Sequence, residues 1–434
     1  MALLHTLSYY VANASLLLFA LFRFKRHYIP EALSTWYSVT LGIKCLATLA
    51  VGLIFRYAFP YLTDPEALFA ASVKLYELLR QHPHSLLEIF VHDRIANLPY
   101  AEIPRAFFLL KCLTLLNFMT GSSYWLNSLW LSTLSFFCTW LLCLQIRRFS
   151  ASAFFPSILC FLLVPSTVFW SSGILKESLG FGMLCLLITF WLRALQHPSF
   201  PFKECIGSIF PCYVLFHVRF YILGAFALVA VPYYVATKLF PIKGISSIPF
   251  QRPFAFCILF VLSWLGMNWI CHLIYGVGTL ELVYFTHRTF VEWEMANFTF
   301  EDLQPTWLSI LSTLPQALWH GLFTPQLWEA TSFWAFLEGV QNSLSLLLLS
   351  IASILWIRHP TRPSFLGSAL LLYVFVSAAF ISLSAPNFGS LARYKLAYMP
   401  FLNFMCILYL FNHFKLRPTR YANPRFLAYF RRPN

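Results

Sequence analysis

Basic side chains at the starts of apolar segments are the residues of this chain whose type and position could do chemistry. They mark three helix starts: Lys176 with Glu177, Arg219, and Arg393 with Lys395. A cation in a first turn opposes the helix dipole, whereas an anion there binds free backbone N–H groups. The pattern predicts a site that holds one phosphate between these side chains. The alternatives are that Lys176 only neutralises Glu177, and that the long side chains reach lipid headgroups.

A carboxylate for acid–base chemistry is expected at the start of the first external segment. Asp64 directly precedes Pro65, a pair typical of a helix start. As a general base, Asp64 would take the proton of an acceptor hydroxyl within hydrogen-bond distance. Its alternative role is an N-cap for the helix beginning at Pro65. The secondary candidates are Glu66, Asp93, Glu292 and Glu294.

The composition requires a membrane to position these residues. The chain is 59% hydrophobic and 11% charged, whereas soluble domains average about 25% charged residues. We predict an all-α integral membrane protein with about eleven transmembrane helices, each needing about 20 apolar residues. The segments are 5–22, 35–56, 123–145, 152–170, 173–194, 205–218, 220–239, 254–275, 333–357, 364–384 and 394–412. Ser171 or Ser172 is placed to cap the helix that begins near Lys176.

Lysines and arginines in short loops predict the orientation. They favour an extracytoplasmic N-terminus and a cytoplasmic basic tail at 413–434. The membrane is expected to be a bacterial inner membrane. Of the 16 acidic residues, only Glu31 and Glu204 then fall inside. We treat 1–434 as one membrane domain with external segments 58–122 and 276–332, which carry interfacial helices. The net charge of +14 lies in loops and the tail, which favours anionic lipids over nucleic acid as partner.

Other chemistries lack their motifs. The 11 cysteines form no CxxC pair and no Cys/His cluster, so no metal site is predicted, and a divalent cofactor has no support. GxxxxGK[ST], GxGxxG, GxSxG and HExxH are absent, which removes the usual nucleotide-binding and hydrolase classes. The energy of any reaction would have to come with the substrate.

The layout and four short stretches resemble the polytopic glycosyltransferases of the GT-C type and bacterial polysaccharide-assembly membrane proteins. These stretches are the external loop with Asp64 near its start, PSTVFWSSGILKES, LPQALWHGLFTPQLWE and NFGSLARYK. The resemblance implies a sugar donor carried on a polyprenyl phosphate, a glycan or lipid acceptor, and transfer at the outer face. By position it implies Asp64 as the base and Lys176, Arg219 and Arg393 as phosphate ligands. The chain departs from the family by having a helix before its catalytic loop and no clear DxD or ExD.

Three other functions fit the same residues. In an O-antigen polymerase or ligase-like transferase, Arg219 and Arg393 would grip lipid pyrophosphate. In a transporter or flippase for a lipid-linked or anionic solute, the same cations would bind the solute. A structural membrane subunit accounts for everything except the cations at outer helix starts.

Overall fold

The computed structural model describes residues 2–58, 63–85, 89, 104–197, 200–239, 251–361 and 364–414. Over these residues the chain is helical, without a strand. Eight of the described helices are long and apolar enough to cross a membrane, or nine if one bent pair is a single span. The predicted all-α polytopic fold is thereby confirmed. The chain forms two compact units: unit 1 holds 1–190 and 203–220, and unit 2 holds 191–202 and 221–414.

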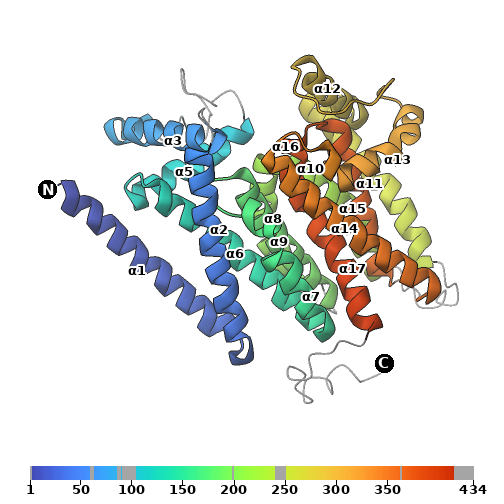
Figure 1. Ribbon diagram of the computed structural model, residues 1–434, viewed down its shortest axis with the longest axis horizontal. Helices are drawn as coiled ribbons and strands as arrows, with labels where there is room; N and C mark the ends of the chain where they lie inside the picture. The colour runs from blue at the N-terminus through green and yellow to red at the C-terminus, as the bar shows by residue number, and fades with distance from the viewer. Residues whose placement is uncertain are drawn as a thin grey trace. The chain divides into compact units, whose positions relative to one another are not determined.

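Unit 1 is built on long apolar helices and one pair of shorter helices (Figure 1). The long helices are α1 (Ala2–Tyr28), α2 (Ser34–Tyr57), α6 (Tyr124–Phe149) and α9 (Lys176–Gln196). The shorter pair consists of α3 (Asp64–Gln81) and α5 (Pro104–Thr120). Both lie in the predicted external segment 58–122. The cytoplasmic or external position of each helix end stays a prediction.

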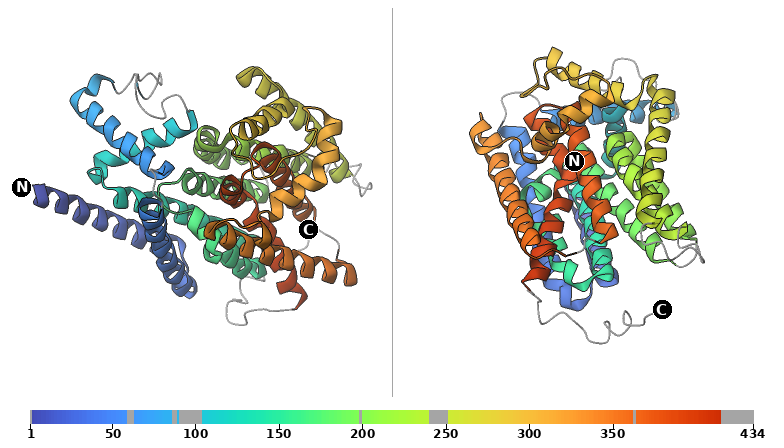
Figure 2. Two further views of the ribbon diagram at one scale, coloured as in Figure 1. Left: turned by 45° about the horizontal axis from the view of Figure 1, so that its top comes forward. Right: turned by 90° about the vertical axis from the view of Figure 1, so that its right-hand side faces the viewer.

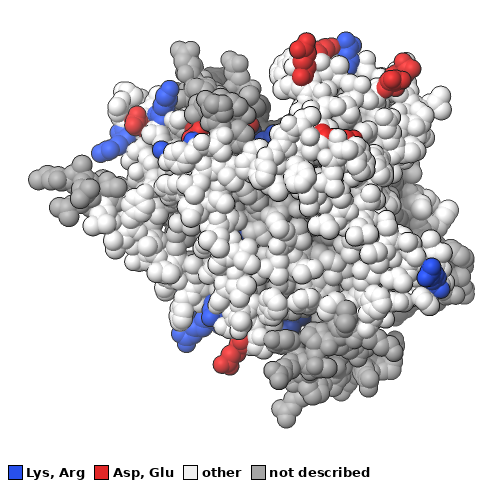
Figure 3. Space-filling model, in the orientation of Figure 1, with Lys and Arg blue, Asp and Glu red and all other residues white. Residues whose placement is uncertain are grey.

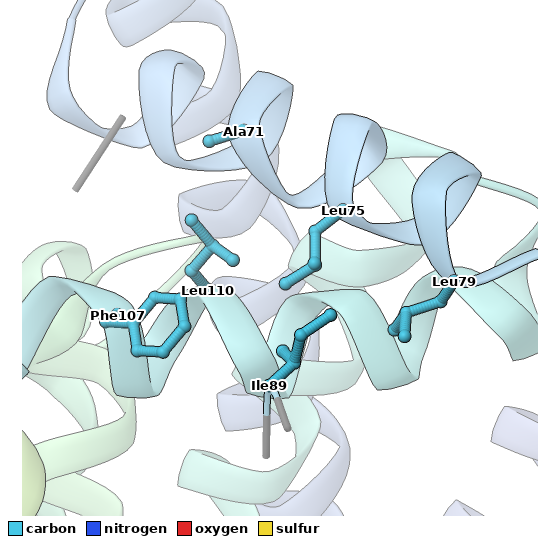
Figure 4. Packing of buried hydrophobic residues seen from close by; sticks show 6 residues of the cluster. All are labelled: Ala71, Leu75, Leu79, Ile89, Phe107 and Leu110. Carbon is cyan, nitrogen blue, oxygen red and sulfur yellow. The ribbon is translucent and has the colours of Figure 1, made fainter. Parts of the chain in front are cut away.

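The pair α3 and α5 is held by a small apolar core. Ala71, Leu75 and Leu79 of α3 recur at helical spacing and face the second helix (Figure 4). They pack with Phe107 and Leu110 of α5, and Ile89 completes the cluster. The helix α3 starts at Asp64 as predicted, but its N-cap is Thr63. The N-cap role for Asp64 is therefore wrong, because Asp64 is the first helical residue.

The predicted span 152–170 is not one helix. It consists of η3 (Ala151–Ala153), α7 (Phe154–Ile158), the π-helical η4 (Leu159–Leu163) and α8 (Pro165–Trp170). Pro165 has no N–H to donate and disfavours helical dihedrals in the residue before it. Val164 is accordingly extended, with φ −60° and ψ 124°. The prediction of a single span here was wrong because it gave Pro165 too little weight.

Helix α10 (Phe202–Leu239) is interrupted at Arg219, whose φ of −149° and ψ of 61° are not helical. Trp191 donates to the carbonyl of Ala230, while a Cβ on Gly207 would lie 2.7 Å from the ring of Phe190. In a straight helix Gly207 and Ala230 would be about 35 Å apart. They could not then contact Phe190 and Trp191, which are neighbours in the sequence. The chain therefore bends sharply at Arg219, between the predicted segments 205–218 and 220–239.

Unit 2 contains long helices together with shorter ones, of which α12 and α13 lie in the predicted external segment 276–332. Its helices are α11 (Gln251–Tyr275), α12 (Thr279–Glu292), α13 (Trp307–Phe323), η5 (Leu327–Glu329), α14 (Phe333–Arg358), α15 (Phe365–Ser384), α16 (Phe388–Tyr394), η6 (Lys395–Ala397) and α17 (Met399–His413). Helix α14 packs along α17, and α13 along α15 (Figure 2). The segment α16–η6 meets α17 at an angle of 56°. The predicted helix 394–412 thus contains this bend.

Acidic residues are one-sided within unit 2. All of them lie between Glu281 and Glu338, from α12 to the first turns of α14. On the face shown in Figure 3, acidic side chains of this unit gather near α12 and the segment after it, and the helix sides are largely uncharged. An uncharged band between charged helix ends is what a bilayer requires.

Candidate functional site

The start of α9 is shaped by a tight turn after α8. Gly173 has φ +73°, and a Cβ there would lie 2.8 Å from Cγ1 of Val51, so the turn requires glycine. Its N–H donates to Oγ of Ser132 at 2.8 Å. The hydroxyls of Ser171 and Ser172 donate to the carbonyl of Val168. Both serines therefore bind the end of α8, and the prediction that one of them caps α9 was wrong.

A buried ion pair joins α9 to the break in α10. The guanidinium of Arg219 donates to Oε1 of Glu177, and both side chains are about nine-tenths or more buried. Arg219 also lies over Gly180, where a Cβ would be 3.4 Å from Cγ of Arg219. A methyl group at position 180, one turn after Glu177, would therefore be in ordinary van der Waals contact with the arginine. The sequence thus predicted both residues of this pair, but not that they bind each other.

The C-terminal end of α2, also in unit 1, lies beside the turn that leads into α9. The ring of Phe55 contacts those of Phe169 and Trp170, just before the turn into α9. The carbonyl of Phe55 accepts the hydroxyl of Thr63, the residue before Asp64. Asp64 is exposed, and Lys176 is half-buried beside Glu177. Glu66 is half-buried, with Oε2 at 3.5 Å from the Thr63 hydroxyl.

A second buried cation of unit 1 was missed by the sequence analysis. Lys44, in the middle of α2, is 5% exposed. Its Nζ donates to the carbonyl of Ser171 at 2.5 Å and to Oγ of the same residue at 2.7 Å. The ammonium thereby satisfies a carbonyl at the C-terminal end of α8. The available signal was a single lysine inside an apolar run, which marks a paired or functional residue.

In unit 2, the predicted cations have different surroundings. Lys395 is 4% exposed, and its Nζ donates to the carbonyl of Thr324 at 2.6 Å and to Oδ1 of Asn342 at 3.1 Å. Arg393 is half-buried, and its Nε donates to the carbonyl of Gly389 at 3.1 Å. Lys395 and Arg393 belong to unit 2, whereas Lys176, Glu177 and Arg219 belong to unit 1. Binding of one phosphate by all of these cations stays a prediction.

The secondary carboxylates lie outside these clusters or outside the described residues. Glu292 is exposed and pairs with Arg288 at 2.8 Å, one helical turn apart. Glu294 is exposed with φ +54°. Asp93 lies outside the described residues. Within the ranges that the structure describes, no group of three His, Cys, Asp or Glu side chains could hold a metal ion.

Chemically, the guanidinium at the break in α10 is bound to a carboxylate. Arginine offers planar, paired donors that match either a carboxylate or a phosphate. The mutual attraction of the two charges offsets part of the cost of their desolvation, so an anion that took the place of Glu177 would have to supply a similar attraction. Compared with known proteins, the chain matches no family model, no curated sequence and no solved structure.

Proposed function

We propose that this protein is a membrane glycosyltransferase that uses a sugar donor linked to a polyprenyl phosphate at the extracytoplasmic face. The observation that carries the proposal is the buried Arg219, held by Glu177 at the start of α9. A buried cation within an apolar protein is costly and marks a functional site by default. The partners are the lipid-linked donor, a glycan or lipid acceptor, and anionic membrane lipids.

In the proposed reaction, the donor phosphate replaces Glu177 on Arg219, and Lys176 adds a second charge. Asp64 takes the proton of the acceptor hydroxyl as its oxygen attacks the anomeric carbon. The bond from that carbon to the phosphate oxygen breaks, and polyprenyl phosphate leaves with the electron pair. Arg219 and Lys176 stabilise the negative charge that develops on this leaving group. The chain itself thus supplies binding, a base and charge stabilisation.

The test is donor binding and turnover in proteoliposomes with a radiolabelled polyprenyl-phosphate sugar. Replacing Arg219 by Gln should weaken donor binding by about 1.5–3 kcal/mol, the range for a hydrogen bond to a charged group. Asp64→Asn should abolish transfer while leaving binding intact. Arg288→Gln is the matched control, because Arg288 is an exposed arginine paired with Glu292. Equal donor affinity in Arg219→Gln and Arg288→Gln would remove Arg219 from the site.

A second candidate, a transporter for a lipid-linked or anionic solute, is favoured by one observation. Each unit has an interrupted helix: the η4–α8 run in unit 1 and the η6–α17 bend in unit 2. Interrupted helices in corresponding halves are typical of secondary transporters. Movement of the intact donor across the vesicle membrane, without chemical change, would identify this function.

A further inference from the structure

At the C-terminal end of α13 in unit 2, backbone carbonyls without helical partners accept hydrogen bonds from side chains. A helix end leaves up to four such carbonyls without helical partners. Here the donors are four side chains: Tyr398 to Gly321 O at 2.5 Å, Gln326 to Phe323 O at 2.8 Å, Lys395 to Thr324 O at 2.6 Å, and Asn342 to Pro325 O at 2.8 Å. Two of these donors, Lys395 and Tyr398, come from the bend between η6 and α17. The bend is therefore fastened to α13 by these hydrogen bonds.

The ammonium of Lys395 is the one charged donor in this set of four. Its two acceptors, Thr324 O and Oδ1 of Asn342, are neutral. The negative charges that favour its protonated form are those of Glu338 on α14 and Glu329 on η5. Both carboxylates belong to half-buried residues. Burial disfavours the charged ammonium, and the two carboxylates favour it, so the charge of Lys395 depends on both.

A histidine binds the same threonine. Nδ1 of His320 lies 3.0 Å from Oγ1 of Thr324, and its ring stacks on Phe298 at 4.1 Å. Burial lowers the pKa of His320; the charge of Glu329 opposes this and that of Lys395 adds to it. Thr324 thus joins a neutral imidazole, through its hydroxyl, to an ammonium, through its carbonyl. The surroundings favour one positive charge at this place rather than two.

We propose that Lys395, with Glu338, Glu329 and His320, forms a proton-binding site that fastens the η6–α17 bend to α13. When Lys395 is protonated, its charge-assisted hydrogen bond holds the Thr324 carbonyl. When Lys395 loses its proton, that bond weakens and the end of α13 loosens. The ionisable groups that act on Lys395 or on its neighbours in the bend include Glu338 from α14, Glu329 from η5, His320 from α13, Tyr373 from α15, Tyr398 from the bend and Tyr221 from α10. The site does not depend on sugar transfer.

Hydrogen exchange of residues 321–326 in lipid nanodiscs tests the proposal, with rates corrected for the pH dependence of chemical exchange. In the wild type, protection should fall about tenfold between about pH 6 and about pH 10, as a hydrogen bond to a charged donor becomes a neutral one. Lys395→Arg keeps its charge over this range, so its protection should not change with pH. Lys395→Met should show low protection throughout, and Glu338→Gln should lose protection at a lower pH than the wild type.

Lys44→Met is the matched control, because Lys44 is an equally buried lysine that binds a helix-end carbonyl in unit 1. It should leave the pH response of residues 321–326 unchanged. The proposal is overturned if protection in the wild type is constant over the range. It is equally overturned if Lys395→Arg loses protection at the same pH as the wild type.

Discussion

Among the residues that the structure describes, each unit has one buried lysine that binds the carbonyl at a helix end, but the charged groups that act on the two lysines differ. Lys44 in unit 1 donates to both oxygens of Ser171, and the side chains whose charges act on it are thiols. Lys395 in unit 2 donates to Thr324, and the charges that act on it are those of Glu338 and Glu329. The same capping contact is therefore influenced by carboxylates in unit 2 and by none in unit 1.

The buried carboxylate of unit 1 has a different partner. Glu177 pairs with Arg219, whose guanidinium stays protonated at any pH that a protein meets. In unit 1 the buried Glu177 thus pairs with a permanent cation, whereas in unit 2 Glu338 and Glu329 act on a lysine that can lose its proton. The comparison shows that the role of a buried cation depends on the ionisable groups around it as well as on its hydrogen bonds.

The largest expected effect comes from breaking the ion pair of unit 1. Glu177→Leu should destabilise the protein by about 3–5 kcal/mol, because it removes the carboxylate that compensates the buried charge of Arg219. Adding Arg219→Met to the same chain should restore much of that loss. Denaturant unfolding in detergent micelles measures both variants. A double variant no more stable than Glu177→Leu would show that the pair contributes packing rather than charge compensation.

Two glycines sharpen the comparison through packing. A Cβ on Gly321 of unit 2 would overlap the backbone carbonyl of Ala378, whereas one on Gly180 of unit 1 would lie 3.4 Å from the flexible side chain of Arg219. We expect Gly321→Ala to cost about 1–3 kcal/mol through overpacking. Gly180→Ala should be neutral or gain up to about 1 kcal/mol of helix propensity. Thermal unfolding of the two variants tests this order, and similar losses would contradict it.

Removing the lysine cap of unit 1 should have an effect of similar or smaller size. Lys44→Met leaves the carbonyl of Ser171 without this donor, which should cost about 1–3 kcal/mol. Denaturant unfolding in detergent micelles at neutral pH measures this loss. An unchanged stability would show that the bond to Ser171 contributes little.

The smallest effect concerns two histidines within the predicted external segment 276–332 of unit 2. Burial lowers the pKa of His287 and of His320. Below the ordinary value of about 6.5, the unfolded chain then binds more protons than the folded one, so stability falls as pH decreases through that range. Above it these histidines contribute no pH dependence. Unfolding of His320→Gln should show a shallower acid slope than the wild type; an unchanged slope would exclude His320 as its source.

Helix positions followed from the sequence where apolar runs were long and uninterrupted. The start of α3 at Asp64 and the break at Arg219 could be predicted because a proline and a lone cation mark them. The bonds of Lys44 and Lys395 could not, since each lysine binds a backbone carbonyl, a group that every residue has and no side-chain pattern reveals. The pairing of Glu177 with Arg219 was equally hidden, because 42 residues separate them. The short pieces of 151–170 were missed although Pro165 is visible.

The order of synthesis separates the two lysines once more. The acceptors of Lys395 are made before it, since Thr324 and Asn342 precede it by 71 and 53 residues. Lys44 is made 127 residues before Ser171. At about 5–20 residues per second, that interval lasts roughly 6–25 s. During this time α2 must enter the bilayer with a central lysine that costs about 2.5–3.5 kcal/mol to insert. The apolar residues of α2 must therefore supply the free energy of membrane insertion before the ribosome has made Ser171.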